Sequence, residues 1–266
     1  SNLLKYMTFK SKNTNHLYTI FVTTLTLISL SSCKSKHYQN YLVEGKKIEI
    51  NKNYVANENI DAYIAPYRAH IDKDLDSVIS YCPETLDKTK GEWQTNIGNF
   101  LADACLELAN PVFMKQQNKQ IDIILLNSGG IRSIIPKGNI TKRNAFEVMP
   151  FENSLIVVAL KGEQIKALAQ HIITEKKPHP LNGLKIILNK ENAITNILFS
   201  GQAIDNNKIY YVATSDYLAN GGDNMSFFLK NEGTYDLNYK IRNLLIDYFY
   251  KHKTIEASNT TRIIKE

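Results

Sequence analysis

The pattern of hydrophobic and polar positions predicts several helices from residue 57 onward. Apolar residues recur every three or four positions over 60–75, 97–108, 165–173 and 237–249, which indicates helices with one apolar face. Pro111 is expected to end the second helix, because proline lacks the backbone N–H that a helix interior uses. The last prediction places Leu237 on the same helix as Phe249.

Short apolar runs between these helices predict strands. IDIILLN at 121–127 and SLIVVAL at 154–160 have the length and the branched side chains of buried strands. Shorter strands are expected at 78–81, 184–188, 194–199, 209–213 and in TTRIIK near the end of the chain. Helices and strands are interspersed, which predicts an α+β (mixed α/β) fold: one domain over 57–266, with a mixed sheet and packed helices.

The first 32 residues instead have the pattern of a secretory signal peptide. Lys10 and Lys12 precede an apolar run at 17–30, which at fourteen residues is short for a membrane span. Residues 30–33, Leu-Ser-Ser-Cys, resemble a bacterial lipobox, in which Cys33 carries the lipid. An uncleaved anchor or a short helix with an incidental cysteine is the alternative. We therefore expect a lipoprotein of the bacterial cell envelope, with residues 33–56 as its lipidated tether.

The net charge of +6 does not indicate a nucleic-acid polymer as partner. Three lysines lie in residues 1–32, which contain no acid, so the rest of the chain has 29 basic and 26 acidic residues. These lysines are dispersed rather than clustered with aromatic residues, as nucleic-acid binding would require. Apart from Cys33 only Cys82 and Cys105 remain, and we expect two separate, buried thiols, although an oxidising envelope would permit a disulfide.

Three loops carry residues that a hydrophobic core would not select: NSGGIR at 127–132, MPFENSL at 149–155 and SDYLANGGDNMSF at 215–227. Glycines in the first loop allow a sharp turn and a close approach to a ligand, and Arg132 offers a forked donor for phosphate or carboxylate. Phe151 and Tyr217 could stack on a base, and Asp223 could accept hydrogen bonds from two ribose hydroxyls. Ordinary turns, a surface arginine and rings that cover the core are the alternative interpretation.

Four signatures in order, TNIGNFLADA, NSGGIR, PFENSLIVVALKGEQI and TSDYLANGGDN, make the chain resemble the C-terminal domain of the 5'-nucleotidases over about residues 60–265. That family includes ecto-5'-nucleotidase and bacterial UDP-sugar hydrolase. The resemblance implies that Phe151 and Tyr217 sandwich the base and that Asp223 binds the ribose hydroxyls. The substrate-binding positions that it implies are Asn127, Gly130, Arg132, Phe151, Asn153, Tyr217 and Asp223.

The chain departs from the family pattern at three positions. Ser128 replaces a usual glycine, Asn224 stands where glycine is common, and Trp93 aligns with a frequent arginine. Loss of that cation would weaken the hold on a phosphate or another anionic group. We therefore expect recognition of the base to be better preserved than recognition of the phosphate.

The family's hydrolytic chemistry requires two divalent metal ions in an N-terminal metallophosphatase domain, held by Asp-x-His, Gly-Asn-His and His-x-His motifs. None of these motifs occurs around His70, His171, His179 or any other histidine, so we expect no metal or other cofactor on this chain. The favoured hypothesis is a nucleoside- or nucleotide-recognition domain that acts with a separate metallophosphatase chain, inactive alone. A non-catalytic nucleotide-binding lipoprotein and a degenerate domain for protein interaction are the alternatives.

Overall fold

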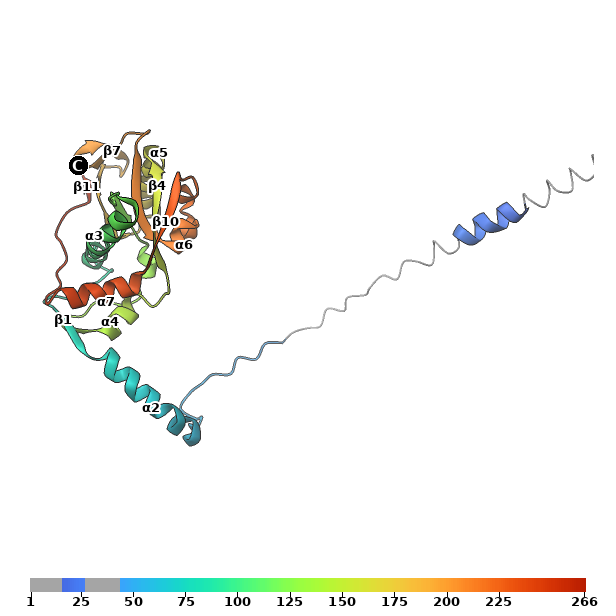
Figure 1. The fold of residues 1–266 in the computed structure, drawn as a ribbon, viewed down its shortest axis with the longest axis horizontal. Helices are drawn as coiled ribbons and strands as arrows, with labels where there is room; N and C mark the ends of the chain where they lie inside the picture. Colours follow the sequence, from blue (N-terminus) through green and yellow to red (C-terminus); the bar gives the residue numbers. More distant parts are fainter. Residues whose placement is uncertain (1–15, 27–43) are drawn as a thin grey trace, which may run out of the picture. The chain divides into compact units, whose positions relative to one another are not determined.

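The computed structural model describes residues 16–26 and 44–266 (Figure 1). The chain divides after Ala56 into two units, which are described separately. Residues 16–26 form a helix in the first unit, and no helix in the described ranges is long and apolar enough to span a bilayer. Cys33 and the expected cleavage site lie outside the described residues, so the signal peptide and lipid anchor stay predictions.

A five-stranded mixed sheet lies at the centre of the second unit. In spatial order its strands are β10 (Gly233–Lys240), β4 (Ser154–Lys161), β9 (Ile209–Ser215), β2 (Ile123–Leu125) and β5 (Leu181–Asn182). β2 and β9 pair in parallel, whereas the other neighbours pair antiparallel. β4 and β9 stay in register from Leu155 opposite Ser215 to Lys161 opposite Ile209.

Two smaller sheets complete the strands. One has the order β11 (Ile263–Lys265), β6 (Leu184–Leu188), β7 (Ile194–Phe199) and β8 (Gln202–Ala203), with β11 parallel to β6. The other pairs β1 (Val78–Cys82) with β3 (Gly138–Thr141). The strands expected from the apolar runs are thus present, together with the short β3, β5 and β8.

The helices of this unit are α2 (Glu58–Leu75), α3 (Asn96–Gln117), α4 (Lys142–Val148), α5 (Gly162–Glu175), α6 (Asp216–Ala219) and α7 (Ile241–Lys251), with short 3-10 turns η1 (Ser128–Gly130), η2 (Gly222–Asn224) and η3 (Ser226–Leu229). Two sequence predictions were wrong. Pro111 lies inside α3, which continues to Gln117 and ends where Asn118 adopts a left-handed conformation. Leu237 lies in β10, because Gly233–Lys240 pairs with β4 and the last helix begins only at Ile241.

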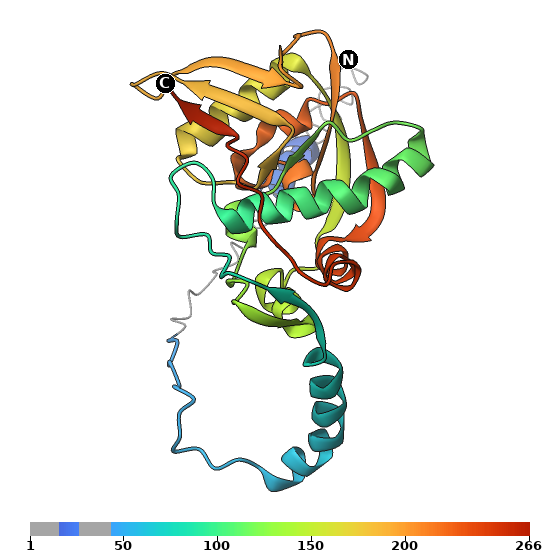
Figure 2. The ribbon, with the colours of Figure 1, turned by 90° about the vertical axis from the view of Figure 1, so that its left-hand side faces the viewer.

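Both faces of the central sheet are buried. Side chains of Leu155 and Val157 pack with α3 and α7, whereas Val158 and Leu160 pack with α5 on the opposite face. Figure 2 shows α3, in green, running across one face of this sheet. A strand buried on both faces needs apolar residues at nearly every position, which explains the continuous run SLIVVAL. The fold is α+β, with packed helices around a mixed sheet.

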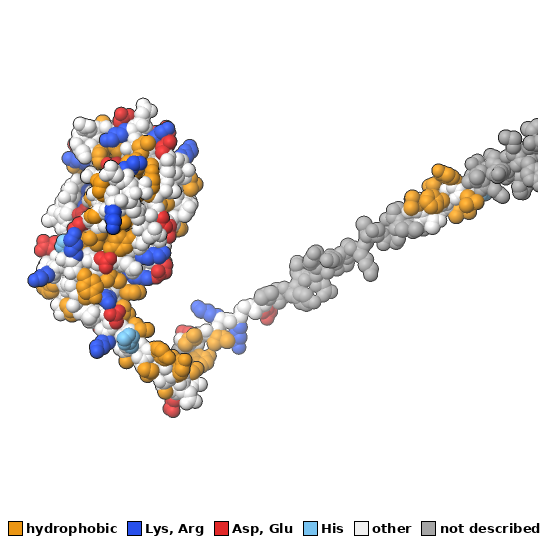
Figure 3. Space-filling model, viewed as in Figure 1, with side chains coloured by type: hydrophobic (Ala, Val, Ile, Leu, Met, Phe, Trp, Pro, Cys, Tyr) orange, Lys and Arg blue, Asp and Glu red, His pale blue; other side chains and the backbone are white. Residues whose placement is uncertain are grey.

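The helix α2 differs from the others because none of its residues is buried. Its apolar side chains, among them Ile60, Tyr63 and Tyr67, are more than half exposed and gather along α2 in Figure 3. Ion pairs join this helix to α4, from Arg143 to Asp72 and Asp76 and from Lys142 to Asp74.

The two cysteines of the domain are separate and buried, as expected. Cys82 at the end of β1 and Cys105 inside α3 are both free thiols. Burial raises the pKa of the Cys105 thiol to about 12 and also raises the pKa of Cys82. Both side chains therefore behave as small hydrophobic residues of the core.

Candidate functional site

The candidate residues meet at one end of three adjacent strands. β2 and β9 are parallel, so their carboxyl ends lie at the same edge of the sheet, and β4 begins there because it runs antiparallel to β9. Asn127 lies just after β2, Tyr217 just after β9, and Asn153 immediately before β4. The sheet therefore brings together three loops that are far apart in sequence.

These loops enclose a pocket of about 330 Å³. Its lining residues are Asn127, Gly129, Gly130, Arg132, Phe151, Asn153, Tyr217 and Asp223. All seven positions implied by the family resemblance thus line one pocket, and Gly129 is an addition that the sequence reasoning missed.

Asp223 is fixed by hydrogen bonds from two sides of the pocket. Asn127 donates its Nδ2 hydrogen to Oδ2 of Asp223 at 2.7 Å, and the Tyr217 hydroxyl donates to Oδ1 at 2.8 Å. The same hydroxyl oxygen accepts from the backbone N–H of Asp223 at 3.1 Å. Each carboxylate oxygen keeps a second lone pair that can accept from a ligand hydroxyl.

The Gly-Gly pair makes this arrangement possible. Gly221 has φ +84°, a conformation that disfavours a side chain, and a Cβ on Gly222 would lie 2.6 Å from atoms of Tyr217. Asp223 itself has a left-handed backbone, with φ 50° and ψ 33°. Asp and Asn adopt this region more readily than other side chains, so the loop carries an acid where most residues would be strained.

The two aromatic rings are exposed for residues of their size. Phe151 is 44% and Tyr217 47% exposed, whereas Phe100 and Phe113 of the core are at most 1% exposed. The guanidinium of Arg132 lies 5.8 Å from the centre of the Phe151 ring and donates to the Gly129 carbonyl oxygen at 3.3 Å. The interpretation of these rings as a cover of the core is therefore not supported, since both line the pocket instead.

Two further residues position this site, and the sequence reasoning missed both. Asp216, the first residue of α6, accepts a hydrogen bond from the Ser154 backbone N–H at 3.1 Å and so ties the Tyr217 loop to the start of β4. His179 is 4% exposed and its Nδ1 atom accepts from the Ser128 backbone N–H at 3.2 Å. Neither residue lies in a recognisable motif, and His179 was expected to be structural or solvated.

The departures from the family pattern have simple structural explanations. Ser128 is not among the residues with positive φ, so its position does not require glycine, while Asn224 adopts φ 58°, which asparagine tolerates. Trp93 is only 7% exposed and packs in the hydrophobic cluster around α5 rather than lining the pocket. At this position the chain therefore offers the pocket no cation.

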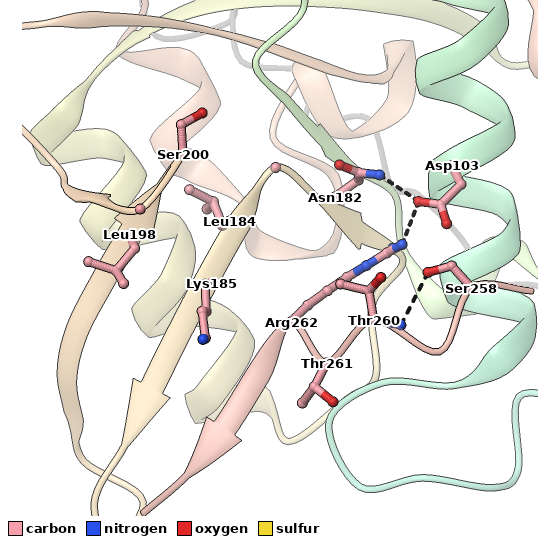
Figure 4. Close-up of a pocket in the computed structure, with 12 residues that line it drawn as sticks. Asp103, Asn182, Leu184, Lys185, Leu198, Ser200, Ser258, Thr260, Thr261 and Arg262 are labelled. Atoms are coloured by element: carbon pink, nitrogen blue, oxygen red, sulfur yellow. Dashed lines mark hydrogen bonds and ion pairs between the residues drawn. The ribbon is translucent and has the colours of Figure 1, made fainter.

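A second hollow, of about 590 Å³, is larger but contains none of the candidate residues. Figure 4 shows Asn182 and Arg262 both pointing to the carboxylate of Asp103 at its inner side. Arg262 also donates to the Leu181 carbonyl oxygen, so its hydrogen-bonding capacity is used within the fold. This hollow is a gap between sheet and C-terminal segment, and we assign the candidate site to the smaller pocket.

Comparison with known families agrees with this geometry. The family described as 5'-nucleotidase, C-terminal domain, matches residues 78–230, which is more than half of the chain. The chain belongs to this family. That match contains every residue that lines the pocket, and it begins after α2.

Among curated relatives of this 5'-nucleotidase C-terminal domain, the trifunctional nucleotide phosphoesterase protein YfkN of Bacillus subtilis is 32% identical over 55% of this chain and 10% of its own length. Protein UshA of Yersinia enterocolitica is 26% identical over 72% of the chain and 33% of its own length. The crystal structure of a 5'-nucleotidase precursor from Thermus thermophilus is 26% identical, with a TM-score of 0.64, over 78% of this chain and 42% of that protein. The chain therefore spans less than half the length of each of these relatives.

Proposed function

We propose that this domain recognises the nucleoside part of a nucleotide for a phosphate-ester hydrolase of nucleotide catabolism. The observation that carries the proposal is the convergence of two exposed aromatic rings and a doubly fixed carboxylate on one pocket. Phe151 and Tyr217 would hold the base by stacking, which contributes about 1–3 kcal/mol per base. Asp223 would accept hydrogen bonds from the two ribose hydroxyls, with Asn153 beside the base.

The hydrolytic step would come from a metallophosphatase partner that holds two divalent metal ions. Such ions lower the pKa of a bound water and neutralise phosphoryl oxygens. In the part of the chain that the structure describes, no group of three or more His, Cys, Asp or Glu residues could hold a metal ion. Relatives named as 5'-nucleotidases, from Bos taurus for example, carry most of their length outside the region matched here, which fits a division of labour between recognition and catalysis.

The binding step is tested by calorimetry with adenosine, AMP and UDP-glucose. We expect at least one of the three to bind wild-type protein, and Phe151→Ala or Tyr217→Ala to weaken that binding by about 1 kcal/mol or more. Tyr63→Ala is the matched control, because Tyr63 is 71% exposed on α2 and does not line the pocket. Unchanged affinity in both pocket variants would refute the assignment.

The catalytic partner is tested by phosphate release from AMP. We expect activity that exceeds the sum of the separate proteins when this chain is mixed with a metallophosphatase from the same genome. Binding of nucleoside without any gain on mixing, and without a complex, would favour the alternative of a non-catalytic nucleotide-binding lipoprotein. If no nucleotide raises the melting temperature, the pocket would have lost its ligand and a role in protein interaction would be favoured.

A further inference from the structure

The dipeptide His179–Pro180 holds the backbone on both sides of Asn127. The Leu126 backbone N–H donates to the Pro180 carbonyl oxygen at 2.9 Å, and the Ser128 backbone N–H donates to Nδ1 of His179 at 3.2 Å. The intervening Asn127 then donates to Asp223 at 2.7 Å. A continuous chain of hydrogen bonds thus leads from a buried imidazole to the carboxylate of the pocket.

The hydrogen bond to Ser128 also determines the tautomer of His179. A backbone N–H can only donate, so Nδ1 must be the unprotonated nitrogen and the ring proton lies on Nε2. That Nε2 atom is buried and has no hydrogen-bond partner among the described residues. The favourable polar contact of this ring is therefore the one at Nδ1, directed at the loop.

We propose that His179 is a positioning residue of the nucleoside pocket: its imidazole accepts the Ser128 N–H and thereby fixes the loop that carries Asn127 and Arg132. The inference rests on the proposed function, because the pocket is taken to bind a nucleoside. His179 does not line the pocket and touches no ligand in this assignment. It acts through the backbone at Ser128, and removal of its acceptor leaves a partly buried N–H unpaired.

The surroundings of His179 keep its ring uncharged, as this role requires. Burial and the neighbouring His171 ring of α5, with its centroid 6.4 Å away, lower the pKa of His179 to about 4. Lys177 acts in the same direction, whereas Asp223 of the pocket and Glu175 at the end of α5 oppose it. Protonation at Nδ1 would replace the acceptor by a donor and break the contact with Ser128.

The experiment compares His179→Leu with His179→Asn. Leucine removes the acceptor, whereas the Asn side chain can place Oδ1 near the position of Nδ1 and cannot titrate. His171→Leu is the control, because its buried Nε2 likewise has no partner and it makes no hydrogen bond to the loop. Amide hydrogen exchange without ligand reports the Ser128 N–H, and calorimetry with adenosine, AMP and UDP-glucose reports the pocket.

We expect His179→Leu to speed Ser128 exchange and to weaken nucleoside binding, each by about 10-fold or more, while His179→Asn and His171→Leu remain within about 3-fold of wild type. In the wild-type protein, nitrogen NMR should find the ring proton on Nε2. A proton on Nδ1, or equal Ser128 exchange in His179→Leu and wild type, would overturn the proposal. Failure of wild-type protein to bind all three probes would count against the proposed function instead, and exchange would still decide the role of His179.

Discussion

Replacement of His179 by asparagine should make the stability of the domain less dependent on pH. In the folded protein the pKa of His179 is lowered from 6.5 to about 4, chiefly by burial. Between these two values the unfolded chain binds a proton that the folded domain does not. The contribution is therefore fully present above pH 6.5 and is lost as the pH falls toward 4.

The magnitude follows from linkage between protonation and folding. A shift of about 2.5 units corresponds to about 3 kcal/mol below pH 4, and about 2 kcal/mol of it is lost between pH 7 and pH 5. Asparagine has no such proton, so the variant should lose about 2 kcal/mol less than wild type over this interval. Other titrating groups are common to both proteins and cancel in the comparison.

The assay is urea denaturation of wild type, His179→Asn and the control His70→Gln at pH 7 and pH 5, with the free energy of unfolding extrapolated to water. His70 lies on the exposed helix α2, so its variant should follow the wild type. Equal losses of stability in wild type and His179→Asn would refute the reasoning, because His179 would then titrate alike in the folded and unfolded chains.

Three further predictions follow from the geometry. Tyr217→Phe keeps the ring but removes its hydrogen bonds with Asp223, so calorimetry should find nucleoside binding weaker by about 0.5–1.5 kcal/mol, and equal affinity would contradict the bonds. Gly183→Ala should lower the free energy of unfolding in urea by more than about 1 kcal/mol, because Gly183 has φ +89° and a Cβ would lie 2.1 Å from the Asp122 carbonyl oxygen; unchanged stability would exclude this contact. Cys33→Ser should abolish labelling with radioactive palmitate in a bacterial host and move the protein to the soluble fraction, and retained labelling would exclude this lipidation site.

Periodicity predicted most elements correctly because the central sheet is buried on both faces and the helices α3, α5 and α7 each bury one face. It failed where local signals compete. Pro111 does not end α3, because one missing N–H is tolerated in a helix that packs against the sheet. Leu237 has apolar neighbours at helical spacing, yet the alternation of Tyr235, Leu237 and Tyr239 fits a strand, and pairing with β4 decides between the two.

The site was predictable where motifs mark it and not where packing creates it. The three loops were visible because glycine, aromatic and acidic residues interrupt apolar runs. His179 was not, because its role depends on a contact with Ser128 across 51 positions of sequence. Likewise, nothing in the spacing of Ile60 and Tyr67 indicated that α2 would leave its apolar face exposed.

The two hydrogen bonds on Asp223 have a consequence for the thermodynamics of recognition. A free aspartate side chain samples several rotamers and loses that freedom when a ligand binds. Here Asn127 and Tyr217 hold both carboxylate oxygens in the ligand-free protein, so most of this conformational entropy is already lost on folding. A ribose would therefore meet a rigid acceptor, and little of its binding energy would be offset by ordering of the side chain.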